Sequence, residues 1–217
     1  MTELLTLDPD QLLTTTRAVR KRLDLTRPVP RSLVEECVEV AVQAPTGSNT
    51  QGWRWLLVDD PAVKAGLADL YGRAFDPYAA APKPDYGVGD SRTDRAAAVT
   101  DSARYLREHF HEVPVLLVPL IEARPDTSGL TIAQASSWGS ILPAVWSFLL
   151  AARARGLGSA WTTLHLFFEH EAAELLGVDD TRWMQAGLFP IAFTKGTDFQ
   201  PAPRVDWHDL VSWNRMD

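Results

Sequence analysis

The stretch IAQASSWGSILPAVWSFLLAARAR, Ile132–Arg155, is helical in length and apolar nearly all round. Its large apolar side chains do not fit on one stripe of a helix; they are Trp138, Ile141, Leu142, Val145, Trp146, Phe148, Leu149 and Leu150. A helix of this kind is buried on several sides, whereas a surface helix carries a single apolar stripe. We therefore expect residues 132–155 to lie at the centre of the core or in a subunit interface.

Strand patterns flank this helix on both sides. Before it, VPVLLVPLIEA (113–123) is an apolar run of strand length, which suggests a buried central strand. After it, a Gly-Leu-Gly return at 156–158 leads into SAWTTL (159–164), which reads as a strand. We expect a short helix near 172–176 and a further strand in MQAGLFPIAF (184–193).

Cap signals predict the first helices of the chain. Asp8, Pro9 and Gln11 form a capped helix start, and we expect this helix to carry a basic cluster at its far end. The cluster consists of Arg17, Arg20, Lys21 and Arg22. The elements that follow are a helix pattern that Pro45 stops, a strand in WRWLLV (53–58) and a proline-started helix over 61–74.

The segment 76–93 contains enough proline and glycine to deny regular structure. A loop of this length inside a compact domain is usually a lid, a partner arm or disordered. A helix over 94–111 should follow. The mixed order of helices and strands predicts an α+β sheet fold, and we interpret residues 1–217 as one domain because no linker-like stretch divides them.

Bulk properties exclude several classes of protein. A net charge of −7 argues against a nucleic-acid-binding domain, since such domains gather Lys and Arg on one face. The apolar runs are interrupted before the length of a membrane span, and the acidic N-terminus lacks the charge of an export signal. Cys37 is the single cysteine, which fits a reducing cytoplasm. It falls on an apolar helix face and is expected to be a core residue.

The turn QAPTGSNTQGWRW, Gln43–Trp55, gathers small polar groups between a helix pattern and a strand. Gly47 would allow the backbone to approach a ligand closely, and short polar side chains surround it. Trp53 and Trp55 are expected to serve the core. The histidines near 109–111 and 165–170 lack the H-E-x-x-H spacing that places two imidazoles on one helix face, so a metal site is not expected.

Four segments together resemble the FMN-dependent nitroreductase family, over essentially the whole chain and in the same order. The segments are TTTRAVRKRLD, QAPTGSNTQGW, RGLGSAWTTLHL and the late arginine of FQPAPRVD. They look most like an actinobacterial subgroup related to the iodotyrosine deiodinase branch. The resemblance implies a nitroreductase-like α+β fold with a central mixed or antiparallel sheet, a long buried helix at the dimer interface, and FMN as cofactor.

The resemblance also implies an FMN phosphate site. The family's R-x-x-x-[RK] segment falls on Arg17 and Lys21, with Ala18 and Val19 between them making backbone and packing contacts. Arg17 would hold the phosphate, and Lys21 would lie near the pyrimidine edge of the flavin. Arg204 matches the late phosphate arginine. Several relatives place a lysine one or two positions earlier, where this chain has Ala202 and Pro203, so the site would hold one charge fewer.

Two further segments would contact the flavin ring by the same resemblance. The turn of Pro45, Thr46, Gly47, Ser48 and Asn49 matches the family's P-S-x-x-N segment, which commonly comes from the second subunit. The segment of Trp161, Thr162, Thr163 and Leu164 matches the stretch whose backbone N–H points at flavin N5, a role carried over here to Thr163. No protein side chain is expected to be catalytic, since the flavin carries the chemistry.

The expected activity is a ping-pong reaction in a homodimer. NAD(P)H would deliver hydride to N5 of FMN, and electrons would then pass to a flat acceptor such as a nitroaromatic or a quinone. One alternative is a specialised reaction such as reductive dehalogenation, for which Lys83, Asp85, Asp90 and Arg92 are candidates to grip a zwitterionic amino acid. Another is a non-catalytic protein that binds or stores flavin.

Overall fold

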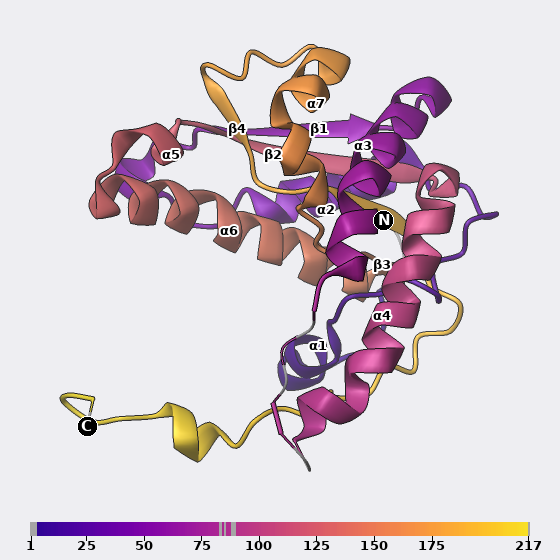
Figure 1. The fold of residues 1–217 in the computed structure, drawn as a ribbon, viewed down its shortest axis with the longest axis vertical. Coiled ribbons are helices and arrows are strands. Elements are labelled where there is room, and N and C mark those ends of the chain that lie inside the picture. The colour runs from indigo at the N-terminus through magenta and orange to yellow at the C-terminus, as the bar shows by residue number, and fades with distance from the viewer. Residues whose placement is uncertain (1–3, 83, 85, 88–89, 217) are drawn as a thin grey trace.

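A computed structural model describes residues 4–82, 84, 86–87 and 90–216, and the side chains of these residues except Ser91 and Ser128. Helices lie on both sides of a small sheet (Figure 1). The strands are β1 (Trp53–Val58), β2 (Val115–Glu122), β3 (Leu157–Gly158), β4 (Trp183–Gln185) and β5 (Phe189–Phe193). Their order is β1-β2-β5-β3, β4 also pairs with β2, and every pair of these strands is antiparallel. The predicted α+β class is confirmed.

The central strand β2 divides the interior into two cores. Val115, Leu117 and Ile121 face the core that α2 (Arg31–Ala41) and α6 (Thr131–Ala154) complete. The alternate side chains of Leu116, Val118 and Leu120 face the second core, under α3 (Pro61–Ala80), α4 (Ser91–His109) and α7 (Glu169–Leu176). Successive side chains of a strand point to opposite faces, so an apolar run with no polar alternation buries both faces, as the sequence predicts.

Helix α6 forms as predicted, with bounds one residue earlier at each end. By length and composition alone it could cross a membrane, but Ile141, Val145 and Phe148 are fully buried against the sheet and α2. Only 39% of its most apolar window is buried within one chain. One side of α6 therefore belongs to the core, while a large apolar part of it faces outward.

The basic cluster does not lie on the first helix, so that part of the prediction is wrong. The capping box of Asp8 and Gln11 is present, with the Gln11 N–H donating to Asp8 Oδ1 over 2.7 Å, but α1 ends at Thr15 (Pro9–Thr15). Val19 N–H donates to the Ser159 carbonyl over 2.7 Å, and Ala18 pairs with Ser159 in a single parallel bridge. The segment after Thr15 leaves the helix because it gains these bonds to Ser159, which follows β3.

Helices α3 (Pro61–Ala80) and α4 (Ser91–His109) are longer than predicted. α3 continues through Pro77, because Phe75 and Ala79 still pack into the second core. The predicted loop over 76–93 is thus wrong at both ends, and residues 83, 85, 88 and 89 lie outside the described residues. The remaining short elements are α5 (Pro125–Ser128), α7 (Glu169–Leu176), η1 (Gly47–Asn49), η2 (Phe110–Glu112), η3 (Leu164–Phe168) and η4 (Trp207–Leu210).

Two strand predictions need correction. In place of the strand expected at 159–164, the structure has the two-residue strand β3 just before it. Within 159–164, Ser159 and Thr162 each make a single isolated bridge. The strand expected at 184–193 divides into β4 and β5. Gly187, with φ +146°, lies at the break, and Leu188 pairs with Thr162 instead of β2.

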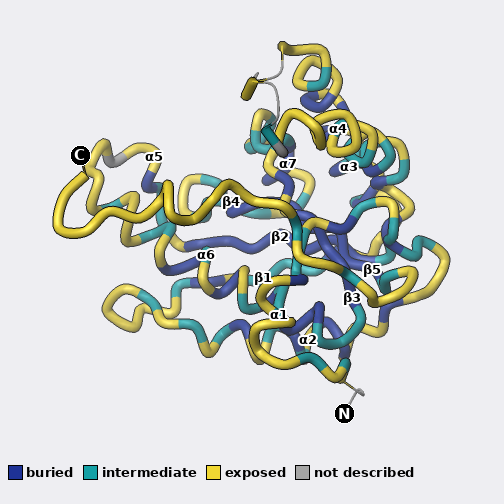
Figure 2. The backbone as a smooth tube through the Cα atoms, turned by 90° about the horizontal axis from the view of Figure 1, so that it is seen from below, coloured by how far each residue is buried: buried dark blue, intermediate teal, exposed yellow. Residues whose placement is uncertain are grey.

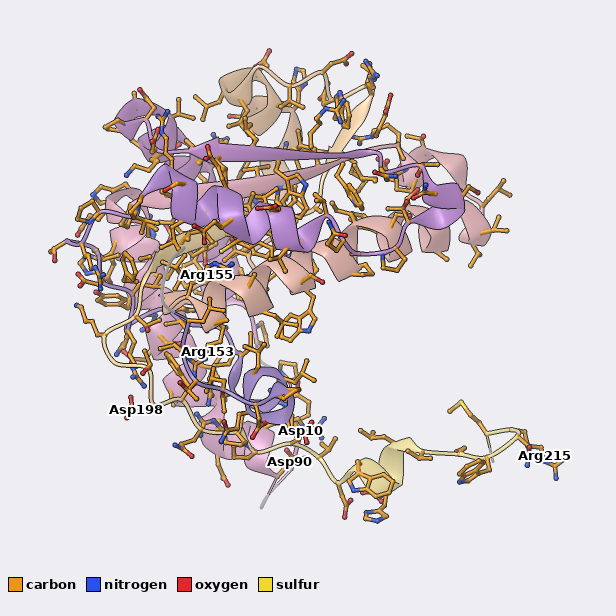
Figure 3. The ribbon with its side chains drawn as sticks, turned by 180° about the vertical axis from the view of Figure 1, so that it is seen from behind. Asp10, Asp90, Arg153, Arg155, Asp198 and Arg215 are labelled. Atoms are coloured by element: carbon orange, nitrogen blue, oxygen red, sulfur yellow. The ribbon has the colours of Figure 1, made fainter. Side chains whose placement is uncertain are left out.

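The last segment, from about residue 205 to 216, runs away from the body of the molecule (Figure 1). Most of it is exposed (Figure 2), including the apolar side chains of Val205, Trp207, Leu210, Val211, Trp213 and Met216. Arg215, near its end, stands clear of the rest of the protein (Figure 3).

Candidate functional site

Arg17 lies where the first helix, the C-terminal part of α6 and the C-terminal segment meet. It lines a cavity of about 150 Å³ together with Arg153 and Trp146 of α6, Ser159 and Trp161. Its guanidinium donates from Nη1 to the Gln200 carbonyl over 3.0 Å. Ala18 and Val19 line the same cavity, so the segment 17–19 contributes one charged and two apolar residues to it.

A second pocket, of about 400 Å³, opens beside the first. Arg17 lines both, and in the second pocket it is joined by Arg204 from the C-terminal segment and Arg95 from α4. Aromatic side chains of Phe75, Tyr78 and Tyr86 line it as well. Burial lowers the pKa of Arg17, and the positive charges of Arg95 and Arg204 lower it further. Residues from the two ends of the sequence therefore meet as a cluster of cations.

Lys21 is placed differently from Arg17. Its Nζ pairs with the Asp101 carboxylate of α4, and both side chains are well exposed. Lys21 lines a shallower hollow that also includes Arg17, Arg95 and Phe199. The lysine thus comes to the same side of the molecule as Arg17, with its charge compensated by a carboxylate.

The return segment from Trp161 to Leu164 is held in place by the turn before β5. Trp161 donates from Nε1 to the Ala186 carbonyl over 3.1 Å, and its ring lies 5.4 Å from that of Phe189. Thr162 is buried and bonded to Leu188 through backbone and hydroxyl. Leu164 is half-buried and packs on the second core.

Thr163 is exposed, and its backbone N–H has no acceptor among the described residues. Its carbonyl accepts from Leu166 N–H over 3.0 Å, so the residue begins η3 while its amide stays free. An N–H held in place by its neighbours and lacking a partner is suited to donate to a bound ligand.

The turn at 45–49 packs against the N-terminal half of α6. Gly47 N–H donates to Ser140 Oγ over 3.0 Å, and a Cβ at Gly47 would lie 2.9 Å from Ser136 Oγ. The reason for glycine here is thus the close helix. Ser48 and Asn49 have φ of +51° and +54°, a left-handed conformation that costs free energy in residues other than glycine. Thr46 Oγ1 accepts from Gln51 N–H over 3.1 Å and fixes the turn.

One chain does not bring this turn and Arg17 to the same place. The turn contacts α6 at Ser140, whereas the cavity at Arg17 lies against Arg153 of the same helix. Arg153 is 13 positions from Ser140 in α6, about 20 Å at 1.5 Å per residue, and Trp146, the nearest α6 residue of the cavity, is six positions away, about 9 Å; the turn lines neither pocket at Arg17. Pro45, Thr46, Gly47, Ser48 and Asn49 consequently form a second part of the candidate site, separate from the first.

Two arginines at the site escape prediction from sequence. Arg95 stands in a polar helix pattern with no distinguishing neighbour. Arg153 ends an apolar helix, and it is only 5% exposed. Its Nη2 donates to the Thr197 carbonyl over 2.9 Å, while Nε and Nη1 have no partner among the described residues. Burial, and then the charge of Arg22, lower its pKa.

The other candidate groups are structural. Cys37 is buried, and burial raises the pKa of its thiol to about 11, as expected of a core cysteine. Trp53 is buried and donates to the Ser140 carbonyl, and the Trp55 ring stacks on Phe148, which confirms their core role. In the described part of the chain, His, Cys, Asp and Glu form no cluster of three that could hold a metal ion.

Two nitroreductases are similar to this chain over most of its length. 4-Nitrobenzoate reductase from Nocardioides sp. (strain LMS-CY) is 27% identical over 239 residues, covering 96% of this chain and 91% of that protein. Chloronitrobenzene nitroreductase from Comamonas testosteroni is 26% identical over 209 residues, covering 82% of this chain and 84% of that protein.

Solved structures show the same fold. The FMN- and NADPH-dependent nitroreductase NfnB from Sphigopyxis sp. strain HMH superposes with a TM-score of 0.68 at 19% identity, covering 97% of this chain and 100% of that one. Iodotyrosine deiodinase bound to FMN and 3-iodo-L-tyrosine gives 0.68 at 23% identity, covering 94% and 98%. The model of the nitroreductase family matches residues 13–193, and the chain therefore belongs to the nitroreductase family.

Proposed function

We propose that two copies of this chain form an FMN-dependent oxidoreductase that uses NAD(P)H to reduce a flat organic acceptor. The observation that carries the proposal is the meeting of Arg17 and Arg204, which are far apart in sequence, in one pocket beside the Trp161–Leu164 segment. When bound, FMN would supply the redox chemistry, accepting hydride from the nicotinamide and passing electrons to the acceptor in a ping-pong cycle. The chain's own residues would bind, orient and shield the flavin.

The residues present fit the phosphate end of FMN. Arg17 and Arg204 each donate only to a backbone carbonyl within the described residues, so their remaining N–H groups and their charges are available to a phosphate. Arginine presents a fork of donors that matches phosphate oxygens. Ala18 and Val19 would line the path of the ribityl chain, and Lys21 would lie at the polar edge of the ring.

The fit extends to the reactive part of the ring. The free amide of Thr163 would donate to N5, and the bonds that hold Trp161 and Thr162 would keep that amide in position. A fixed donor at this atom orients the ring and tunes its electron affinity. Leu164 would close the apolar side of the segment.

The position of the turn at 45–49 supports a homodimer. Within one chain this turn contacts α6 at Ser140 and lines neither pocket at Arg17. A second copy packed on the outward apolar side of α6 would bring its own Ser48 and Asn49 to the first copy's ring. The partly exposed Trp146 on α6 would then be covered.

Nitroaromatic compounds are the acceptor class that we favour. Trp146 and Trp161 border the cavity at Arg17, and rings of this size stack readily on flat substrates. The two relatives described above are named for nitrobenzoate and chloronitrobenzene. For reductive dehalogenation, Lys83 and Asp85 lie outside the described residues, and Asp90 and Arg92 are paired with each other, which leaves neither free to grip an amino acid.

The test is an absorption spectrum of the purified protein, with FMN added if it is colourless, followed by anaerobic NADH or NADPH. We expect a bound-flavin spectrum that bleaches and is restored by 4-nitrobenzoate. No FMN binding would contradict the proposed function. A bound flavin that bleaches slowly, whatever the acceptor, would instead favour a flavin-storage protein.

A further inference from the structure

Arg95 belongs to the same cation cluster as Arg17 and Arg204. It comes from the second turn of α4, an element that sequence reasoning did not connect with the cofactor. Arg95 and Arg17 line two hollows in common, the pocket of about 400 Å³ and the shallower one beside Lys21. Three chain segments thus each deliver one guanidinium to a single place.

The three arginines differ from the basic residues round them. Lys21 pairs with Asp101, Arg22 with Asp198 and Arg92 with Asp90. Within the described residues, Arg17 and Arg204 donate hydrogen bonds only to backbone carbonyls. Arg95 makes no hydrogen bond or ion pair there. The chain has a net charge of −7, yet among its described residues no carboxylate lines the pocket of about 400 Å³, and Asp198, which lines the shallower hollow, is paired with Arg22.

Uncompensated like charges repel one another, and the charges of Arg95 and Arg204 contribute to the lowered pKa of Arg17. An anion bound among the three would turn that repulsion into attraction. A phosphate monoester carries about −1.5 to −2 charge at pH 7 and three acceptor oxygens. Arg17 and Arg204 together already balance this charge, and a third guanidinium would add donors for the third oxygen.

We propose that Arg95 is the third cationic ligand of the FMN phosphate and takes the place of the lysine that this chain lacks at Ala202 and Pro203. The inference rests on the proposed function and adds to it a residue from α4. It also accounts for the lysine that the C-terminal segment lacks, because α4 would supply the positive charge instead.

The test compares FMN with riboflavin, which lacks the phosphate. Apo-protein is titrated with each flavin, and Kd is obtained from the quenching of flavin fluorescence. We expect Arg95→Ala to raise Kd for FMN about tenfold, as for loss of a charge-assisted hydrogen bond, and to change Kd for riboflavin less than about twofold. The Kd of Arg95→Lys for FMN should lie between those of the parent and Arg95→Ala, since lysine keeps the charge but lacks the forked donors of the guanidinium.

Arg104→Ala is the matched control. Arg104 lies on the same helix, is exposed and makes no hydrogen bond or ion pair among the described residues, but it lines a different pocket with Asp76 and Glu108. This variant removes the same charge from α4 and should leave both Kd values unchanged. The melting temperature without flavin should be equal or higher in Arg95→Ala than in the parent, because repulsion in the cluster is relieved.

Three results would overturn the inference. The first is an unchanged Kd for FMN in Arg95→Ala while the parent still prefers FMN to riboflavin, which leaves the proposed function standing. The second is an equal rise of Kd for both flavins, which would make Arg95 a structural residue. The third is an unchanged Kd for FMN with a raised KM for NADPH but not NADH, which would assign Arg95 to the nucleotide's phosphate. If the parent protein binds no FMN, the proposed function fails and the inference with it.

Discussion

The carbonyl of Leu188 accepts two hydrogen bonds from Thr162, one from its N–H over 3.2 Å and one from Oγ1 over 2.5 Å. Leu188 N–H donates in return to the Thr162 carbonyl over 2.8 Å. This pair is the point where the segment that carries Thr163 is fastened to the sheet. The hydroxyl of Thr162 is buried, so no water replaces its bond.

Replacing Thr162 by valine should therefore lower the free energy of unfolding by about 1 kcal/mol, the usual cost of one buried hydrogen bond. The backbone bonds to Leu188 remain, so the fold should be kept. Urea unfolding measures the change. Thr163→Val is the control: its side chain is exposed and makes no hydrogen bond in the described structure, so the change should stay within about 0.5 kcal/mol. Equal losses in both variants would contradict the role given to the Thr162 hydroxyl.

His165 makes the stability of the protein depend on pH. The imidazole is buried, and burial lowers its pKa to about 4; Gln185 lies beside it and offsets part of this effect. Neither ring nitrogen has a hydrogen bond among the described residues. The unfolded chain takes up a proton near pH 6.5, whereas the folded chain does so only near 4. Stability should therefore be full above pH 6.5 and fall as the pH drops towards 4, by at most about 3 kcal/mol.

The measurement is urea unfolding between pH 7 and pH 5, above the range where carboxylates dominate. His165→Asn should flatten this part of the profile, whatever its effect on stability at pH 7. His170→Gln is the control, because His170 is exposed and Asp180 raises its pKa. A histidine pKa that folding raises stabilises the folded state at pH values below the unfolded pKa, and this stabilisation is lost as the pH rises through the folded pKa. Removing it should therefore not flatten the acid side of the stability profile. An unchanged slope in His165→Asn would refute the assignment.

Gly47 lies close against α6. A methyl group at this position would lie 2.9 Å from Ser136 Oγ, closer than side-chain carbons normally come. We expect Gly47→Ala to cost about 1 to 3 kcal/mol of stability, as for an overpacked site. The double variant with Ser136→Ala removes the opposing oxygen and should recover most of the loss. If the double variant is no more stable than the single one, the strain lies in the turn itself and not in the contact with α6.

Much of the fold is predictable from sequence, and the exceptions have physical reasons. The apolar runs predict β2 and α6, and the cap at Asp8 predicts the start of α1, because these signals depend on residues close together in the sequence. The end of α1 and the extension of α3 through Pro77 depend on partners distant in sequence, namely Ser159 and the second core. The residues implied by family resemblance lie in two places, which the proposed second copy would bring together. Arg95 was missed because its helix shows no strong apolar face, so no pattern places it beside Arg17.

The outward side of α6 should carry the dimer contact. Trp146 is 39% exposed there, beside the cavity at Arg17, and a tryptophan at the centre of an interface commonly contributes several kcal/mol. We expect Trp146→Glu to shift the protein from dimer to monomer in sedimentation at micromolar concentration. It should also raise Kd for FMN, because the partner's Ser48 and Asn49 would no longer reach the ring.

Leu175→Glu provides the control for this change. Leu175 has a similar exposure, 37%, but lies on α7, which covers the other face of the sheet. It should leave the sedimentation coefficient and FMN affinity of the parent unchanged, apart from a small loss of stability. A Trp146→Glu protein that stays dimeric and binds FMN as the parent does would place the interface elsewhere. The turn at 45–49 would then need another route to the flavin, since in its own chain it lines neither pocket at Arg17.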